Sequence, residues 1–199
     1  EACVIDANLQ PVPDGSTGID TVSYAYAASG VTASLAVTTA QATGGSGSDT
    51  FTAIENLTGS NYADSLTGSS IANTLDGDVG ADTMAGGDGS DIYYVRDVGD
   101  AVTENNAAAA TGGTDTVYSY LSSYTLGANV ENGRIMATGS ANLSGNALNN
   151  FMYAGAGNNV LDGGTGIDMV SYAYAASGVT VSLAVGGAQA TGGSGSDTL

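Results

Sequence analysis

The chain contains no histidine, tryptophan or lysine, and its only basic residues are Arg96 and Arg134. Catalysis by an imidazole base or a lysine nucleophile is therefore excluded in its usual form, and so is a phosphate-binding loop, which needs a lysine after its glycines. Twenty acidic residues against two basic ones give a formal net charge of −18. Nucleic acid and anionic membrane surfaces both require a basic protein surface, so neither suits this chain as a partner. A multivalent cation suits it well, because folding would otherwise press uncompensated carboxylates together.

Long apolar runs are also missing. No stretch approaches the ~20 residues of a membrane-spanning helix, so we expect no membrane insertion, and nothing at Glu1 resembles a signal peptide. Cys3 is the only cysteine, which excludes an internal disulfide; we expect it to be a small apolar filler, although it could also join two chains. Hydrophobic residues make up 42% of the chain, too many for a permanently solvated coil, so we expect order with a bound cation and disorder without it.

The sequence does contain a nine-residue repeat. From Gly59 to Tyr94 it reads GSNYADSLT, GSSIANTLD, GDVGADTMA and GGDGSDIYY. The sixth positions hold Asp64, Asn73, Asp82 and Asp91, and the eighth positions hold Leu66, Leu75, Met84 and Tyr93. A second array covers about residues 136–171; its sixth positions are Ala141, Asn150, Asn159 and Asp168, and its eighth positions are Leu143, Met152, Leu161 and Val170. The acid or amide and the apolar residue therefore recur at fixed places in both arrays.

A longer repeat defines the organisation of the chain. Residues 14–51 recur 148 residues later as residues 162–199, with six differences. We therefore divide the chain into a cap or joint at residues 1–13, a first module at residues 14–161 and the start of a second, truncated copy at residues 162–199. The chain is then either a segment of a longer array or a subunit whose two ends resemble each other.

Strands are expected between the arrays as well. Val31, Ala33, Leu35 and Val37 alternate with less apolar residues, which predicts a half-buried strand, and residues 179–181 repeat the pattern. The sequence NNAAAATGG at residues 105–113 predicts a loop. Two tyrosines are expected on one strand face in each copy, Tyr24 and Tyr26 in the first and Tyr172 and Tyr174 in the second. They either stack between coils or bind a polysaccharide through exposed rings.

The nine-residue period predicts a particular all-β fold. A glycine-rich turn of about six residues followed by a strand of about three reverses the chain, so two nonapeptides complete a coil of about 18 residues, and coils stack ~4.8 Å apart. The eighth residue is the middle of each strand and faces inward. The sequence therefore predicts a right-handed parallel β-roll or β-helix solenoid, in which stacking pairs Asp64 with Asp82 and Asn73 with Asp91.

Stacked carboxylates repel one another unless a cation lies between them. Calcium accepts roughly six to eight oxygen ligands in a tolerant geometry, whereas magnesium needs a stricter octahedron and zinc prefers histidine or cysteine. We therefore expect several bound Ca²⁺ ions. The candidate carboxylate ligands are Asp20, Asp49, Asp64, Asp82, Asp91, Asp168 and Asp197. The candidate backbone ligands belong to the turn glycines Gly44, Gly45, Gly47, Gly77, Gly80, Gly86, Gly87, Gly89, Gly163, Gly164 and Gly166.

Three nonapeptides, two in the arrays and one at residues 44–52, carry a family resemblance. GGDGSDIYY, GGSGSDTFT and GGTGIDMVS resemble the RTX (repeats-in-toxin) nonapeptide GGxGxDxUx, a calcium-binding repeat. IENLTG from Ile54 and YTLGANVEN from Tyr124 are similar to spacers of long secreted RTX proteins. The resemblance implies a parallel β-roll, bacterial type I (one-step) secretion and folding outside the cell on calcium. Asn150 and Asn159 depart from the family's aspartate, so we expect the second array to bind calcium weakly or not at all and its amides to stack in a hydrogen-bonded ladder.

These features favour a structural function, and we predict that the chain is not an enzyme. A glycosidase built on a carboxylate pair is disfavoured because turn periodicity already explains every acid pair. The predicted function is a calcium-dependent β-roll of an extracellular or cell-surface bacterial protein, such as an adhesin, a matrix or surface-layer protein or a filament subunit. The alternative is a non-catalytic RTX module of a secreted hydrolase, epimerase or toxin. Because an open roll exposes backbone groups at its ends, end-to-end self-association into filaments is also expected.

Overall fold

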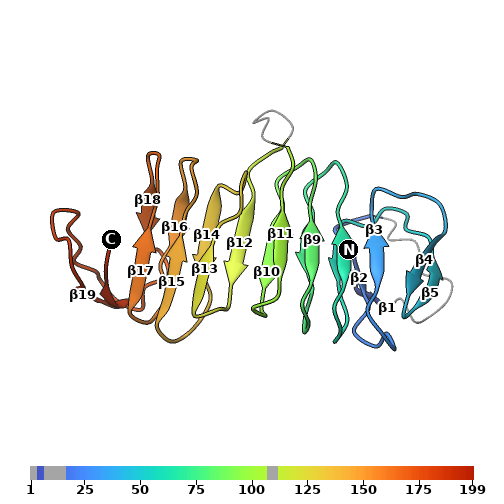
Figure 1. The fold of residues 1–199 in the computed structure, drawn as a ribbon, viewed down its shortest axis with the longest axis horizontal. Coiled ribbons are helices and arrows are strands. Elements are labelled where there is room, and N and C mark those ends of the chain that lie inside the picture. The colour runs from blue at the N-terminus through green and yellow to red at the C-terminus, as the bar shows by residue number, and fades with distance from the viewer. Residues whose placement is uncertain (1–3, 7–16, 107–111) are drawn as a thin grey trace. The chain divides into compact units, whose positions relative to one another are not determined.

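The described part of the chain consists of β-strands joined by turns. The computed structural model describes residues 4–6, 17–106 and 112–199 (Figure 1). Most of the predicted cap at residues 1–13 and the central part of the predicted loop at residues 105–113 lie outside these ranges. None of the described residues forms a helix that could cross a membrane. The chain divides into two compact units, Glu1–Thr114 and Asp115–Leu199.

The first unit contains two parallel sheets and one hairpin. One sheet has the order β1-β2-β6-β8-β10, the other has the order β3-β7-β9-β11, and β4 and β5 form an antiparallel hairpin. The strands are β1 (Val4–Asp6), β2 (Thr21–Ser23), β3 (Thr32–Ser34), β4 (Gln41–Gly44), β5 (Gly47–Asp49), β6 (Asn56–Thr58), β7 (Ser65–Thr67), β8 (Thr74–Asp76), β9 (Thr83–Ala85), β10 (Ile92–Val95) and β11 (Ala101–Thr103).

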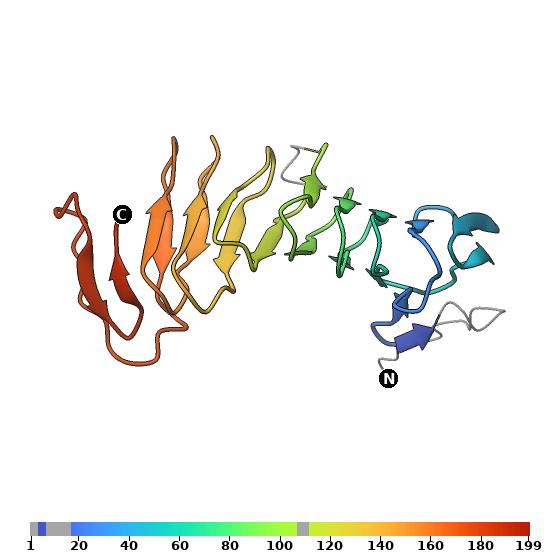
Figure 2. The same ribbon diagram turned by 60° about the horizontal axis from the view of Figure 1, so that its bottom comes forward.

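The second unit repeats this plan on a smaller scale. Its parallel sheets have the orders β12-β14-β16-β18 and β13-β15-β17, and β19 and β20 form an antiparallel hairpin, coloured red in Figure 2. The strands are β12 (Thr116–Ser119), β13 (Ser123–Thr125), β14 (Asn132–Ile135), β15 (Ala141–Ser144), β16 (Phe151–Tyr153), β17 (Asn159–Asp162), β18 (Met169–Ser171), β19 (Gln189–Gly192) and β20 (Gly195–Asp197).

Successive nonapeptides alternate between the two parallel sheets of their unit. Thr74 pairs with Ile92 across β8 and β10, and Ser65 pairs with Thr83 across β7 and β9. Each pair is therefore separated by 18 residues, as are the partners across β16 and β18 in the second unit. Two nonapeptides thus complete one coil, and the predicted all-β parallel solenoid is confirmed.

The eighth residue of the nonapeptide fills the core. Successive side chains of a strand point to opposite faces, so the middle residue of a three-residue strand points inward while its neighbours point outward. In the first array these inward residues are at most 1% exposed: Leu66, Leu75, Met84 and Tyr93. In the second array Leu143, Met152 and Leu161 are equally buried, and Val170 is partly exposed.

Glycine at the first and fourth positions gives the turns their close contacts. A Cβ atom on Gly77 would overlap the carboxylate of Asp82, and a Cβ atom on Gly80 would lie against the carbonyl group of Tyr62 in the preceding coil. Gly80 also has a φ of +150°, which favours glycine. The turns therefore need glycine both for backbone conformation and for the approach of one coil to the next.

The two copies of the duplicated segment differ in their middle. In the first copy Val31, Ala33 and Leu35 are buried around β3, as their alternation predicts, while Val37 is exposed. Residues 179–182 of the second copy form no strand. The strand predicted there is absent because β3 forms by pairing with β7, and the described residues supply no second β7 to the later copy.

The tyrosines expected on one strand face do not share it. Tyr24 is fully buried, whereas Tyr26 is 79% exposed. The strand β2 ends at Ser23, and a turn closed by the N–H of Ala27 donating to the carbonyl of Tyr24 follows. Because strand alternation is lost at this turn, the prediction of a common face is wrong for this pair.

Candidate metal centre

A column of three aspartates occupies the sixth position of successive coils in the first unit. The backbone N–H of Asp64 donates to Oδ1 of Asp82 (2.8 Å), and the N–H of Asp82 donates to Oδ1 of Asp100 (3.2 Å). Asp64 and Asp82 are buried, and Asp100 is partly exposed. Each carboxylate thus contacts the backbone of the coil before it, and the predicted stacking of Asp64 with Asp82 is confirmed.

The intervening turns form a second column. The N–H of Asn73 donates to Oδ1 of Asp91 (2.7 Å), so these two residues also stack as predicted. Beside Asp91, the hydroxyl group of Tyr93 accepts a hydrogen bond from the N–H of Gly86 and donates one to the carboxylate of Glu104. Burial raises the pKa of Tyr93, and the neighbouring Glu104 and Asp91 add to the shift. This column therefore places two buried acids beside a neutral phenol.

The described protein groups compensate the charge of Asp82 only in part. Its side chain is 0% exposed, and its Oδ2 atom has no hydrogen-bond partner among the described residues. Burial raises the pKa of Asp82 to about 6; the charges of Asp100, Asp64 and Asp97 act in the same direction, and the hydrogen bond from the Asp64 amide opposes them. A buried carboxylate in this situation is stabilised by a bound cation.

Sequence analysis missed Asp97 and Asp100 because their turn lacks the paired glycines of the repeat. Oδ2 of Asp100 accepts hydrogen bonds from the backbone N–H groups of Arg96 (2.8 Å) and Asp97 (3.0 Å). The carboxylate of Asp97 accepts one from the N–H of Gly80 (3.1 Å) in the preceding coil. Spacing alone could have found Asp100, which lies nine residues after Asp91.

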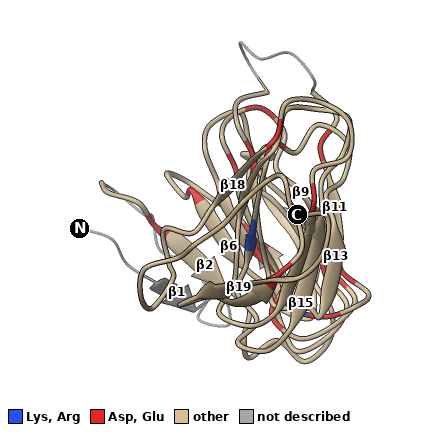
Figure 3. Ribbon diagram, turned by 90° about the vertical axis from the view of Figure 1, so that its left-hand side faces the viewer, with Lys and Arg blue, Asp and Glu red and all other residues tan. Residues whose placement is uncertain are grey.

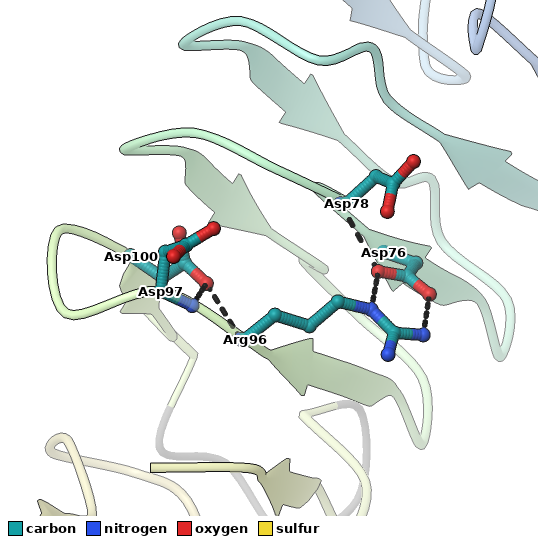
Figure 4. A network of polar contacts seen from close by, with 5 residues as sticks. All are labelled: Asp76, Asp78, Arg96, Asp97 and Asp100. Carbon is teal, nitrogen blue, oxygen red and sulfur yellow. Dashed lines mark hydrogen bonds and ion pairs between the residues drawn. The ribbon is translucent and has the colours of Figure 1, made fainter.

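The only basic side chain of the first unit is used elsewhere. Arg96 points away from Asp97 and Asp100 and binds Asp76 through two parallel contacts, Nε to Oδ1 (2.8 Å) and Nη2 to Oδ2 (2.6 Å) (Figure 4). Asp76 also accepts a hydrogen bond from the N–H of Asp78 (3.1 Å). Since Arg96 is the only lysine or arginine before Arg134, this unit has no further basic side chain for its aspartate column.

Asparagine at the sixth position satisfies backbone groups without a metal. Nδ2 of Asn150 donates to the carbonyl of Glu131 (3.1 Å), and Nδ2 of Asn159 donates to the carbonyl of Ala141 (2.9 Å). Asn73 donates in the same way to the coil before it. The amides therefore bond to the backbone of the preceding coil, which corrects the expected ladder of amide to amide. Weaker calcium binding by the second array stays a prediction.

Two further candidate ligands lie in coil turns. Oδ1 of Asp168 accepts a hydrogen bond from the N–H of Asn150 (2.9 Å), so Asp168 follows the stacking of the first array although it is partly exposed. Asp20 is buried, and its N–H donates to the carboxylate of Glu55 (2.8 Å). Both acids therefore lie at contacts between coils.

Asp49 and Asp197 lie in antiparallel hairpins instead. The carboxylate of Asp49 accepts hydrogen bonds from the hydroxyl groups of Thr43 (2.7 Å) and Tyr24 (3.1 Å). That of Asp197 accepts one from the hydroxyl of Thr191 (3.1 Å) and one from the backbone of β17 (2.8 Å). These contacts distinguish the hairpins from the turns of the arrays, and metal ligation by Asp49 and Asp197 stays a prediction.

The glycines predicted as backbone ligands also fall into two groups, one in a hairpin and one in the coil turns. Gly44, Gly45 and Gly47 lie at the closed end of the β4–β5 hairpin, whereas the others lie in coil turns. Those in coil turns are Gly77, Gly80, Gly86, Gly87 and Gly89 near Asp82 and Asp91, and Gly163, Gly164 and Gly166 near Asp168.

The donors of the first array suit calcium. Asp64, Asp82 and Asp100 offer carboxylate oxygens in one column, and the turns around them offer carbonyl oxygens, which is the ligand chemistry that calcium prefers. Acidic residues recur along the turns (red in Figure 3), whereas the chain has no histidine and one cysteine for zinc. A bound calcium would neutralise the column and link successive coils.

Comparison with known families agrees with this geometry. The family model of the RTX calcium-binding nonapeptide repeat (4 copies) matches residues 58–93 and 137–170, which are the two arrays. No curated protein matches the chain. RTX repeats bind calcium, with several ions across an array, and are typical of secreted bacterial proteins. Residues 58–93 and 137–170 are therefore RTX calcium-binding nonapeptide repeats.

Proposed function

We propose that this chain is a calcium-dependent structural module of an extracellular or cell-surface protein, that it folds on meeting calcium after secretion, and that it is not itself an enzyme. The observation that carries the proposal is the column of Asp64, Asp82 and Asp100, in which Asp64 and Asp82 are buried and one Asp82 oxygen has no partner among the described groups. Without a cation this column opposes folding. With calcium it holds neighbouring coils together.

The net charge supports the same conclusion. A charge of −18 is spread over a chain with two basic side chains, so self-repulsion disfavours the compact state at low ionic strength. Cytosolic free calcium is far below the roughly 10⁻⁴ to 10⁻³ M range in which extracellular calcium modules bind. A module of this kind would stay unfolded in the cell and become rigid outside it.

A supporting role is favoured over catalysis because the acids already have a structural explanation. The buried acids of the first array recur at the sixth position of stacked turns, and the chain lacks histidine and lysine. A stiff module of stacked coils suits an adhesin, a matrix or surface-layer protein, or a filament subunit. Electron microscopy of the chain at millimolar calcium tests the filament role: axial filaments would support it, and short monomers alone would overturn it.

The test of the main proposal is circular dichroism of the full chain during a calcium titration, followed by reversal with EGTA. We expect a coil spectrum in EGTA and a β-sheet spectrum once calcium is added, lost again on chelation. Magnesium at equal ionic strength is the control, because it screens charge equally but fits the donors poorly. A chain with the same β-sheet signal in EGTA as in calcium would refute the proposal.

A further inference from the structure

The two arginines of the chain differ in what their guanidinium groups bind. Arg96 lies over the ring of Tyr94, 5.3 Å from its centre, and forms two parallel bonds with the carboxylate of Asp76 (2.8 and 2.6 Å). Arg134 lies over the ring of Tyr174, 3.5 Å from its centre. In the described part of the chain, no residue forms an ion pair or a hydrogen bond with the guanidinium of Arg134. Arg134 therefore presents N–H donors that no described carboxylate occupies.

The sheet face around Arg134 carries no acid. Gly133 and Ile135 of β14 are buried, so Arg134 between them points outward, and it pairs with residues of β12 and β16 on its two sides. Across β12, β14, β16 and β18 the outward residues form two rows, one of Tyr118, Arg134, Tyr153 and Ser171 and one of Thr116, Asn132, Phe151 and Met169. Although the chain has 20 acidic residues, neither row contains one. An anion at this face meets one positive charge and no acidic side chain of the four strands.

A pocket of about 160 Å³ lies beside this arginine. Arg134 and Tyr174 line it together with residues 135–138 and 154–156, which are neutral and include one hydroxyl group, that of Thr138. The ring of Tyr153 lies 5.5 Å from that of Tyr174 and extends the aromatic surface. The pocket thus combines an aromatic face with a few polar groups that can fix the orientation of a small ligand.

The exposure of Tyr174 is a property of its own turn. Residues 171–178 have the same sequence as residues 23–30, so Tyr26 is the equivalent of Tyr174. Tyr26 is 79% exposed although β6 pairs with β2 after it, and Tyr174 is 56% exposed. A following coil therefore leaves this tyrosine accessible. Since β14 is also paired on both sides, the pocket does not depend on an open end of the solenoid.

We propose that Arg134 and Tyr174 form a binding site for a uronic-acid residue, a sugar ring that carries a carboxylate, within an acidic polysaccharide. The carboxylate accepts two parallel N–H bonds from the guanidinium, as the carboxylate of Asp76 does from Arg96. The C–H groups of the sugar ring pack on the exposed tyrosine ring. The site goes beyond the proposed function, because neither residue is a candidate calcium ligand.

These observations favour a sugar over an acidic peptide or a membrane. A sugar ring fills the neutral pocket and covers the aromatic face, whereas a peptide carboxylate on a flexible side chain uses only the arginine. An anionic membrane attracts clusters of basic residues, and residues 115–199 contain Arg134 alone. The acidity of the rest of the chain does not prevent binding, because charges beyond about 8 Å are largely screened at physiological ionic strength.

The test uses NMR of the full chain labelled with ¹⁵N-arginine, at saturating calcium. Because the chain has two arginines, the Nε–H region contains two signals, and that of Arg96 is the internal reference. Sodium glucuronate is the probe. Sodium acetate supplies the carboxylate alone and glucose supplies the ring alone, while sodium chloride holds the ionic strength constant.

We expect glucuronate to shift the Arg134 signal saturably, with a Kd of about 1–10 mM, and to leave the Arg96 signal unchanged. Acetate and glucose should each bind about tenfold more weakly or less, because each makes only one of the two contacts. The absence of a saturable shift at Arg134 would overturn the site, and so would equal shifts at both arginines. Affinity for acetate equal to that for glucuronate would indicate a site for any carboxylate, an acidic peptide included, and would overturn the sugar. None of these results bears on calcium binding.

Two substitutions in the duplicated sequence form a matched pair. Tyr174→Ala should weaken glucuronate binding by about fivefold or more, whereas Tyr26→Ala should leave it unchanged. Tyr174→Phe keeps the ring and should keep the affinity within about twofold, which separates the loss of stacking from any loss of fold. Equal affinities of Tyr174→Ala and Tyr26→Ala would overturn the site, as would equal weakening by Tyr174→Phe and Tyr174→Ala.

Discussion

Replacing Asp82 by asparagine removes one negative charge from the buried column and keeps the shape of the side chain. The pKa of Asp82 rises from 3.8 to about 6, which corresponds to roughly 3 kcal/mol of free energy against the ionised form. Screening by water near the turns reduces this cost to about 1–2 kcal/mol. Because the pKa in the folded state lies above that of the unfolded chain, ionised Asp82 opposes folding at neutral pH when calcium is absent. Asp82→Asn should therefore stabilise the calcium-free chain by about 1–2 kcal/mol, while it removes a proposed calcium ligand.

Two measurements separate these opposite effects. Circular dichroism in EGTA should give a larger β-sheet signal for Asp82→Asn than for the parent chain, and isothermal titration calorimetry should give fewer bound calcium ions or about tenfold weaker binding. Asp78→Asn is the matched control, since it lies in the same turn, changes the same charge and is not part of the column; it should alter neither result. No gain of β-sheet signal in EGTA together with unchanged calcium binding would refute the assignment of Asp82.

Three further substitutions test the turns, the core and the second array. Gly77→Ala should lower the melting temperature in calcium by the equivalent of about 1–3 kcal/mol, because the added methyl group overlaps the side chain of Asp82. Gly139→Ala is the control and should have little effect, because a methyl group at residue 139 meets no other atom. Equal melting temperatures of the two variants would contradict the packing of the turn. Met84→Ala should lower the free energy of unfolding in urea by about 2–5 kcal/mol, and a loss below about 1 kcal/mol would show that the eighth position is not core. Asn159→Asp removes the donor to the buried carbonyl of Ala141 and should lower the melting temperature in calcium by the equivalent of about 1–3 kcal/mol. Equal melting of this variant and the parent chain in calcium would contradict the structural role of this amide.

Periodicity predicted most of the solenoid because its contacts repeat the same local sequence. The spacing of Leu66, Leu75, Met84 and Tyr93 places one side chain in the core per half coil, and all four are buried. The sixth-position stacking followed from the same spacing. Neither prediction required knowledge of how distant segments meet, since the paired strands of the first array lie 18 residues apart.

Features set by distant contacts could not be predicted in this way. The GGSGSD sequence matches a coil turn, yet it lies in a hairpin that packs beside β3, where the side chain of Gln41 bonds to both backbone groups of Ser34 (2.9 and 2.8 Å). No nine-residue pattern marks that contact. The strand expected at residues 179–181 failed for the opposite reason: its sequence is suitable, but a short strand forms only with a partner. Asp100 was missed because its turn differs in glycine content although its spacing is regular.

The 18-residue coil also restricts how such a chain can change in length. Inserting or deleting 18 residues adds or removes one complete coil and returns every later strand to its own sheet, with its inward residue still inward. A change of nine residues would move every later strand to the opposite sheet, so the column of Asp64, Asp82 and Asp100 would meet the column of Asn73 and Asp91. Variation in length is therefore expected in whole coils, each of which keeps the two columns on their own edges.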